Sequence, residues 1–112
     1  MTERYTDLVQ RLRASVLQGR GVTDPALRQA VASRASALGG GAAGREPAVP
    51  PDISALVDKI ARRAYTVTDA DVQAVRQAGY SEDAVFEITA AAAMGAALGR
   101  LERGMAALTG RA

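Results

Sequence analysis

The sequence predicts a small all-helical domain, and three observations carry that prediction. Apolar residues recur every three or four positions along most of the 112 residues, which is the spacing of amphipathic helices. Glycine, proline, serine, threonine and aspartate separate these stretches, at positions where helices start and stop. No stretch alternates apolar and polar residues in the manner of a strand. A chain of this length is expected to form one domain.

Two helices are predicted in the first part of the chain. The first covers residues 2–18, and its apolar side consists of Tyr5, Leu8, Val9, Leu12 and Val16. Thr23 and Asp24 then provide candidate N-caps, and Pro25 occupies the favoured first position of a helix. A second helix is therefore expected to run to about Ala37.

The sequence divides into three parts within that single domain. Residues 1–38 are expected to form a helical hairpin, residues 39–51 a connector, and residues 52–112 a helical core. The connector reads GGGAAGREPAVPP, and this glycine-rich and then proline-rich composition predicts irregular structure. Neither flank is long enough to be an independent domain.

Three further helices are predicted in the core. Asp52 is a candidate cap for the first of them. The segment from Thr68 to Asp71 resembles a capping box, with aspartate in place of glutamate, and it predicts a short helix that ends near Gly79. Ser81 is positioned to cap the last and longest helix, expected over residues 82–108.

The last helix carries a seam of large apolar residues separated by four and three positions. Gly95, Gly99 and Gly104 also lie in this helix, and glycine in a helix interior costs up to about 1 kcal/mol relative to alanine. All three glycines are therefore expected to meet another helix at close range, either from the same chain or from a second subunit. The predicted interface consists of Met94, Gly95, Leu98, Gly99, Leu101 and Met105.

The absence of two residue types excludes several chemistries. The chain contains no cysteine, so disulfides, thiol catalysis and thiolate metal sites are impossible. It also contains no histidine, which is the commonest general base near neutral pH and the commonest metal ligand. No metal site and no cofactor are expected.

Charge and hydropathy bear on possible partners and on location. The formal net charge is +2, and basic and acidic residues are interspersed, so a nucleic-acid surface is not favoured. Residues 1–12 include Glu3, Arg4 and Asp7, have no long apolar run and do not resemble a secretory signal. The most apolar stretch, residues 84–98, includes Glu87 and is shorter than the roughly 20 residues that cross a bilayer. A cytoplasmic location without membrane contact is expected.

The turn before the last predicted helix has the sequence AGYSEDAV, from Ala78 to Val85. This phrase resembles the A-G-L-S-x-E-E-I turn that links two helices in the carboxymuconolactone decarboxylase and alkylhydroperoxidase D superfamily. The alanine-rich helix that follows is similar to the long packing helix of that family, and the resemblance extends from Leu56 to Leu108. It implies an alkylhydroperoxidase D-like (AhpD-like) bundle of about five helices with a long C-terminal helix.

The same resemblance argues against the redox activity of that family. Its redox members carry a Cys-x-x-Cys-x-x-x-His motif, in which the histidine lies eight residues before the glycine of the turn. Counting back from Gly79 places the two cysteines on Ala64 and Val67 and the histidine on Asp71. All three residues are replaced, and thiol–disulfide exchange requires a thiolate. Thiol peroxidase activity is therefore not expected.

The decarboxylase branch of the family implies acid–base chemistry, which carboxylates can supply. Glu87 and Asp71 are the candidate catalytic residues of a cofactor-free lyase or isomerase, with Arg62, Arg63 or Arg76 binding an anionic substrate. Each carboxylate also has a structural interpretation. Asp71 lies in the first turn of a helix, where an acid stabilises the helix dipole, and Glu87 fits a paired or interfacial charge.

These observations favour a non-catalytic helical protein that acts by association. It is expected to assemble through its last helix into a homo-oligomer, or to serve as a small accessory subunit that binds a protein partner. The lyase or isomerase is the first alternative. A polyanion-binding protein that uses the arginines of the first helix is the second.

Overall fold

The computed structural model describes residues 3–41 and 48–110, and this part of the chain is helical without any strand. The predicted all-helical fold with a long C-terminal helix is confirmed. A short 3-10 turn, η1, follows the third helix. The elements are α1 (Glu3–Gln18), α2 (Pro25–Leu38), α3 (Pro51–Arg63), η1 (Ala64–Thr66), α4 (Asp69–Gln77) and α5 (Glu82–Leu108).

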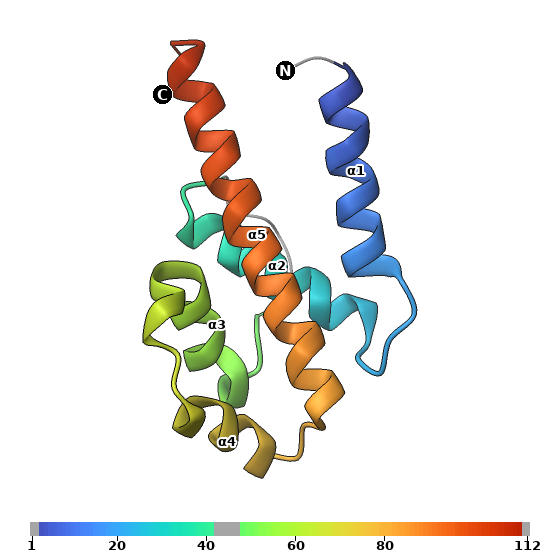
Figure 1. Cartoon of the computed structure of the whole chain (residues 1–112), viewed down its shortest axis with the longest axis vertical. Helices are drawn as coiled ribbons and strands as arrows, with labels where there is room; N and C mark the ends of the chain where they lie inside the picture. Colours follow the sequence, from blue (N-terminus) through green and yellow to red (C-terminus); the bar gives the residue numbers. More distant parts are fainter. Residues whose placement is uncertain (1–2, 42–47, 111–112) are drawn as a thin grey trace.

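The two central helices are α2 and α5, which cross each other in the middle of the molecule (Figure 1). Helices α3 and α4 pack on one side of this pair, and α1 lies on the other side (Figure 1). The first half of α1 and the last turns of α5 extend beyond the other helices, so the molecule measures 45 × 28 × 24 Å. Because α2 packs chiefly on α5, the expected N-terminal hairpin and the expected core share one set of buried residues.

The core is aliphatic and small, as the composition predicts. The fully buried side chains at its centre are Val31, Ile53, Val57 and Ile88, and alanines fill the space between the helices. None of the four aromatic residues is buried, and Tyr5, Tyr65 and Phe86 are more than half exposed. The large side chains that usually dominate a core therefore lie on the surface of this protein.

Local cap chemistry sets most helix ends. The Asp24 side chain accepts a hydrogen bond from the backbone N–H of Ala26 and caps α2, with Pro25 in the first turn. Thr68 and Asp71 form the predicted capping box of α4, and Ser81 caps α5. These three predictions are confirmed, because a cap needs only residues that are neighbours in sequence.

The start of α3 and the connector before it differ from the prediction. Helix α3 begins at Pro51 and has no side-chain cap, whereas Asp52 accepts a hydrogen bond from the Tyr80 hydroxyl at 3.0 Å. The connector predicted over residues 39–51 lies partly outside the described residues. Of its described part, Gly40 adopts a positive φ of 104° just after α2, a conformation that glycine adopts readily.

Gly95 and Gly99 lie where α5 crosses α2. A Cβ atom on Gly95 would lie 2.7 Å from the Cα atom of Ala32, and one on Gly99 would lie 3.0 Å from the Cα atom of Ser36. Real Cβ atoms essentially never lie closer than 3.0 Å to such an atom, so Gly95 has no room for a side chain. Of the two alternatives that the sequence left open, the helix that approaches these glycines is therefore α2 of the same chain.

Among the described helices, α5 is the one that is long and apolar enough to cross a membrane by length and composition. Half of its most apolar window is buried inside the domain. The core helix of a water-exposed domain passes the same test, so the apolar character of α5 is explained at least in part by its packing on α2 and α3.

Candidate functional site

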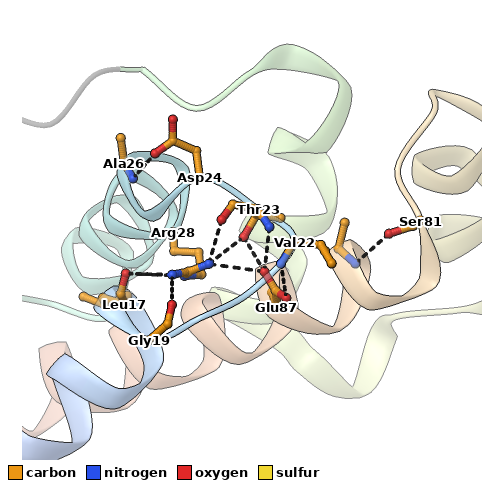
Figure 2. A network of polar contacts seen from close by, with 10 residues as sticks. Leu17, Gly19, Val22, Thr23, Asp24, Ala26, Arg28, Ser81 and Glu87 are labelled. Carbon is orange, nitrogen blue, oxygen red and sulfur yellow. Dashed lines mark hydrogen bonds and ion pairs between the residues drawn. The ribbon is translucent and has the colours of Figure 1, made fainter.

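Glu87 lies in the first half of α5 and binds the connector between α1 and α2. Its carboxylate accepts hydrogen bonds from the backbone N–H groups of Val22 (2.8 Å) and Thr23 (2.9 Å) and from the Thr23 hydroxyl. Figure 2 shows the dashed lines from Val22 and Thr23 meeting at the carboxylate of Glu87. The carboxylate therefore anchors a loop that is more than 60 residues away in the sequence.

Arg28 on α2 completes this network, and nothing in the sequence had identified it. Its side chain is only 2% exposed, and one guanidinium nitrogen lies 3.3 Å from Oε1 of Glu87. The guanidinium also donates to the backbone carbonyls of Leu17, Gly19 and Thr23 (Figure 2). Carbonyls at a helix C-terminus have no partner within the helix, so Arg28 satisfies the end of α1. Together Arg28 and Glu87 connect α1, α2 and α5.

The network sets the protonation state of Glu87. Burial alone raises the pKa of this carboxyl group, but the hydrogen bonds from Thr23 and Val22 and the charge of Arg28 outweigh burial and lower the pKa to about 2. A general base works best when its pKa lies near the working pH. A carboxylate with this pKa and these bound donors is poorly suited to abstract a proton. The geometry supports the interpretation of Glu87 as a paired charge.

Asp71 is also engaged in structural contacts. Its carboxylate accepts hydrogen bonds from Nζ of Lys59 at 2.8 and 3.0 Å and from the backbone N–H of Thr68 at 2.8 Å. The hydrogen bond from Lys59, followed by that from Thr68, lowers the pKa of Asp71 below its ordinary value. Asp71 therefore caps α4 and joins it to α3, which fits its structural interpretation.

The arginines considered for substrate binding are not grouped around Glu87. Arg62 and Arg63 lie on the exposed end of α3, where they line a hollow of about 400 Å³ with Asp58, Lys59 and Thr66. Arg76 lies on α4, 3.8 Å from the carboxylate of Glu82. The structure thus places Arg62 and Arg63 beside the Lys59–Asp71 pair and leaves Glu87 in a separate network.

The three positions that the sequence resemblance aligns with a redox motif fall in the segment from η1 to α4. Ala64 is exposed, and Val67 is half-buried against the core. Asp71 forms the capping box described above. Within residues 3–41 and 48–110, no three histidine, cysteine, aspartate or glutamate side chains are grouped so as to hold a metal ion.

The residues predicted to form an interface divide into two groups. Met94, Gly95 and Gly99 are buried within the chain, on the side of α5 that meets other helices. Leu98 and Met105 are half-buried, and Leu101 is 39% exposed. The last three line a groove of about 630 Å³ between α1 and α5, together with Val9, Gln10, Arg13, Glu102 and Thr109.

A second surface with exposed apolar side chains lies along α1 and α5, and we call it the α1–α5 face. Val16 of α1 lines a hollow of about 300 Å³ with Phe86 and Ala90 of α5, and the charged side chains of Arg20, Arg28 and Glu87 line the same hollow. Phe86, the only phenylalanine of the chain, is 73% exposed. The large exposed side chains on this face are Tyr5, Leu8, Leu12, Phe86, Leu101 and Leu108.

Comparison with known protein families, curated proteins and solved structures finds no match to this chain. Evidence on the function therefore comes from the residues and their geometry. Two carboxylates that were candidate catalysts are held in structural networks, and an extended apolar surface is open to solvent.

Proposed function

We propose that this protein acts by association, either as a homo-oligomer or as a small accessory subunit of a larger complex, and not by catalysis. The observation that carries the proposal is the α1–α5 face, where six large apolar side chains are between 39% and 78% exposed. Their exposed surface amounts to something on the order of 700 Å². Monomeric proteins seldom expose a contiguous apolar patch of more than a few hundred Å².

The chemistry of the chain supports a binding role. Glu87 has a pKa of about 2 and holds a loop, and Asp71 holds a helix start, so neither carboxylate is free to act as a base near neutral pH. A lyase or isomerase would need a base from another group. In the polyanion-binding alternative the three arginines of α1 would bind the polyanion, and one of them, Arg11, pairs with Asp7 at 3.0 Å on the same helix.

The AhpD-like relationship and the cytoplasmic location are parts of the same proposal. The phrase from Ala78 to Val85 forms the link between α4 and α5, with Gly79 at a φ of 109° and Ser81 as the N-cap. This helix–glycine–serine–helix link supports a redox-inactive member of that family. An association protein of this type needs neither a cofactor nor a metal.

The mass of the protein in solution tests the proposal. Size-exclusion chromatography with light scattering, run from about 1 to 100 μM protein, should give a mass above that of one chain. Exchange of Leu8→Glu together with Leu12→Glu places two charges on the α1–α5 face and should lower that mass. Gln73→Glu, on the exposed side of α4, is the matched control and should leave the mass unchanged.

A single-chain mass at every concentration would contradict self-association. The wider proposal of an association protein would fail if, in addition, this monomeric protein bound no partner, or bound one with an affinity that the Leu8→Glu and Leu12→Glu exchanges leave unchanged. Carboxylate-dependent turnover that is lost in Glu87→Gln or Asp71→Asn would instead support the enzyme alternative.

A further inference from the structure

The exposed side of α5 has a regular pattern of side-chain sizes. Its residues are separated by three or four positions, as in a helix that packs along a partner helix. Three alanines follow Phe86 at the N-terminal end of the stripe, and the C-terminal part has two leucines with a glycine between them. In chain order the stripe consists of Phe86, Ala90, Ala93, Ala97, Leu101, Gly104 and Leu108, all exposed except for the half-buried Ala90.

The middle of this stripe can be covered without burying an unpaired charge. Residues 88–99 contain no charged side chain. Arg100 is the first charged residue after them, and its guanidinium turns toward α3, where it donates to the backbone carbonyl of Ala61. Burying a charge without a partner is strongly unfavourable, so the absence of charge here permits close contact with an apolar surface.

The stripe is complementary to itself when two copies of α5 run antiparallel with Ala97 at the two-fold axis. In this register Phe86 of one copy lies opposite Leu108 of the other, and Ala90 lies opposite Gly104. Ala93 then lies opposite Leu101, and Ala97 meets its own copy. The small centre allows the two helices to approach closely, and the large side chains close both ends of the contact. Antiparallel helices also have opposed dipoles, which is favourable.

We infer that a second copy of this chain covers the stripe, with α5 packed antiparallel on α5 of the partner about Ala97. This inference rests on the proposed function and names its partner. A symmetric dimer requires one surface to be complementary to itself, and the stripe meets that requirement. The stripe supplies Phe86, Leu101 and Leu108 of the α1–α5 face, and the dimer must also cover exposed side chains of α1 for the whole face, on the order of 700 Å² per chain, to approach the roughly 800 Å² per partner that a specific dimer buries.

Cysteine cross-linking tests the register, because the natural chain contains no cysteine. At a two-fold axis identical residues face each other, so Ala97→Cys should form a disulfide-linked dimer in nearly all of the protein under mild oxidation. Ala90→Cys lies on the same stripe but opposite Gly104, and it should form at most a tenth as much cross-link. Ala74→Cys, an exposed alanine on α4, is the control for random collision.

A mixture of two single variants checks the offset between the helices. Ala93→Cys and Leu101→Cys should cross-link to each other in the mixture far more than either cross-links alone. Equal self-cross-linking of Ala90→Cys, Ala93→Cys and Ala97→Cys would indicate a parallel pair and would overturn the inferred register.

Light scattering separates failure of the register from failure of the proposed function. A dimeric mass without an Ala97→Cys cross-link would overturn the antiparallel contact and leave association intact. A single-chain mass at 100 μM, with Ala97→Cys no more cross-linked than Ala74→Cys, would overturn both self-association and the contact. A lipid surface is the other possible occupant of the stripe. If the natural chain sediments with vesicles of phosphatidylcholine and phosphatidylglycerol and Ala97→Glu abolishes this binding, the stripe binds lipid and the inference is overturned.

Discussion

The carboxylate of Glu87 links the stability of the domain to pH. Its pKa is about 2 in the folded chain, below the ordinary value of 4.5, so the unfolded chain binds more protons than the folded chain between these two pH values. The stabilising contribution is complete above the unfolded pKa, and it is lost as the pH falls toward 2. At about 1.4 kcal/mol per pKa unit this difference in pKa corresponds to about 3.5 kcal/mol, and solvent screening of the partly exposed carboxylate reduces its contribution near neutral pH to roughly 2 to 3 kcal/mol.

Removal of this charge should therefore weaken the fold and flatten its response to acid. Glu87→Gln is expected to lower the free energy of unfolding by about 2 to 4 kcal/mol at pH 7, because Arg28 keeps its buried charge and loses its anionic partner. The loss should shrink between pH 5 and pH 2. Urea unfolding followed by circular dichroism at several pH values measures both effects.

The exposed carboxylate of Glu82 supplies the comparison. Glu82→Gln should change the free energy of unfolding by about 0.5 kcal/mol or less, because its contact with Arg76 is long and exposed. Equal losses in Glu82→Gln and Glu87→Gln at pH 7 would show that the Glu87 network does not stabilise the fold.

A paired role for Glu87 could be predicted from the sequence, but its partners could not. A lone acid on an apolar helix needs a partner when it is buried, and this follows from the residue type alone. Arg28 lies 59 residues away, on a helix whose other arginine, Arg34, pairs with Asp58 at the surface. Its burial depends on how the end of α1 and the loop between α1 and α2 lie over α2, and no local sequence pattern specifies that arrangement.

At the level of the helix, the glycines of α5 have two different environments. The position of Gly95 against the backbone of α2 leaves no room for a side chain, whereas a Cβ atom on Gly104 would meet no atom within 4 Å in the described chain. Glycine costs the helix interior conformational entropy at both positions. Within the described chain, close packing offsets this cost at Gly95, whereas the close approach predicted for Gly104 is not found there.

Two alanine exchanges should therefore have opposite effects. Gly95→Ala is expected to destabilise the fold by about 1 to 3 kcal/mol, because the backbone of α2 must move away. Gly104→Ala is expected to stabilise the single chain by up to about 1 kcal/mol at a concentration too low for dimers, since alanine favours the helix and no other atom of the described chain is in the way. Thermal unfolding of both variants at one protein concentration gives the comparison, and a stabilised Gly95→Ala would contradict the close contact with α2.

The helix order and the caps could be predicted because their causes are local, whereas the partner of the α5 seam could not. Spacing identified Gly95 and Gly99 as positions of close approach, but the same spacing fits a helix of the same chain or of a second subunit. The contact with Ala32 and Ser36 decides between these alternatives for the two glycines. Because Gly95 and Gly99 face α2, the solvent-exposed side of α5 is the one that carries Phe86, and it coincides only in part with the predicted seam.

At the level of the whole molecule, the domain has a thin core and a large exposed apolar face. Alanines contribute little buried area, so one copy of this chain gains limited stability from its own core. Association adds stability by mass action when only the folded chain associates. The stability of this protein should then depend on its concentration.

The melting temperature measures that dependence directly. With an unfolding entropy of about 2 cal/mol/K per residue, a folded dimer of two such chains should gain about 3 °C in Tm for each tenfold rise in concentration. Ala97→Glu places a charge at the centre of the inferred contact and should abolish the dependence, whereas Ala74→Glu on α4 should preserve it. A Tm of the natural chain that is constant from 1 to 100 μM would mean that its exposed apolar face is not covered by a second copy.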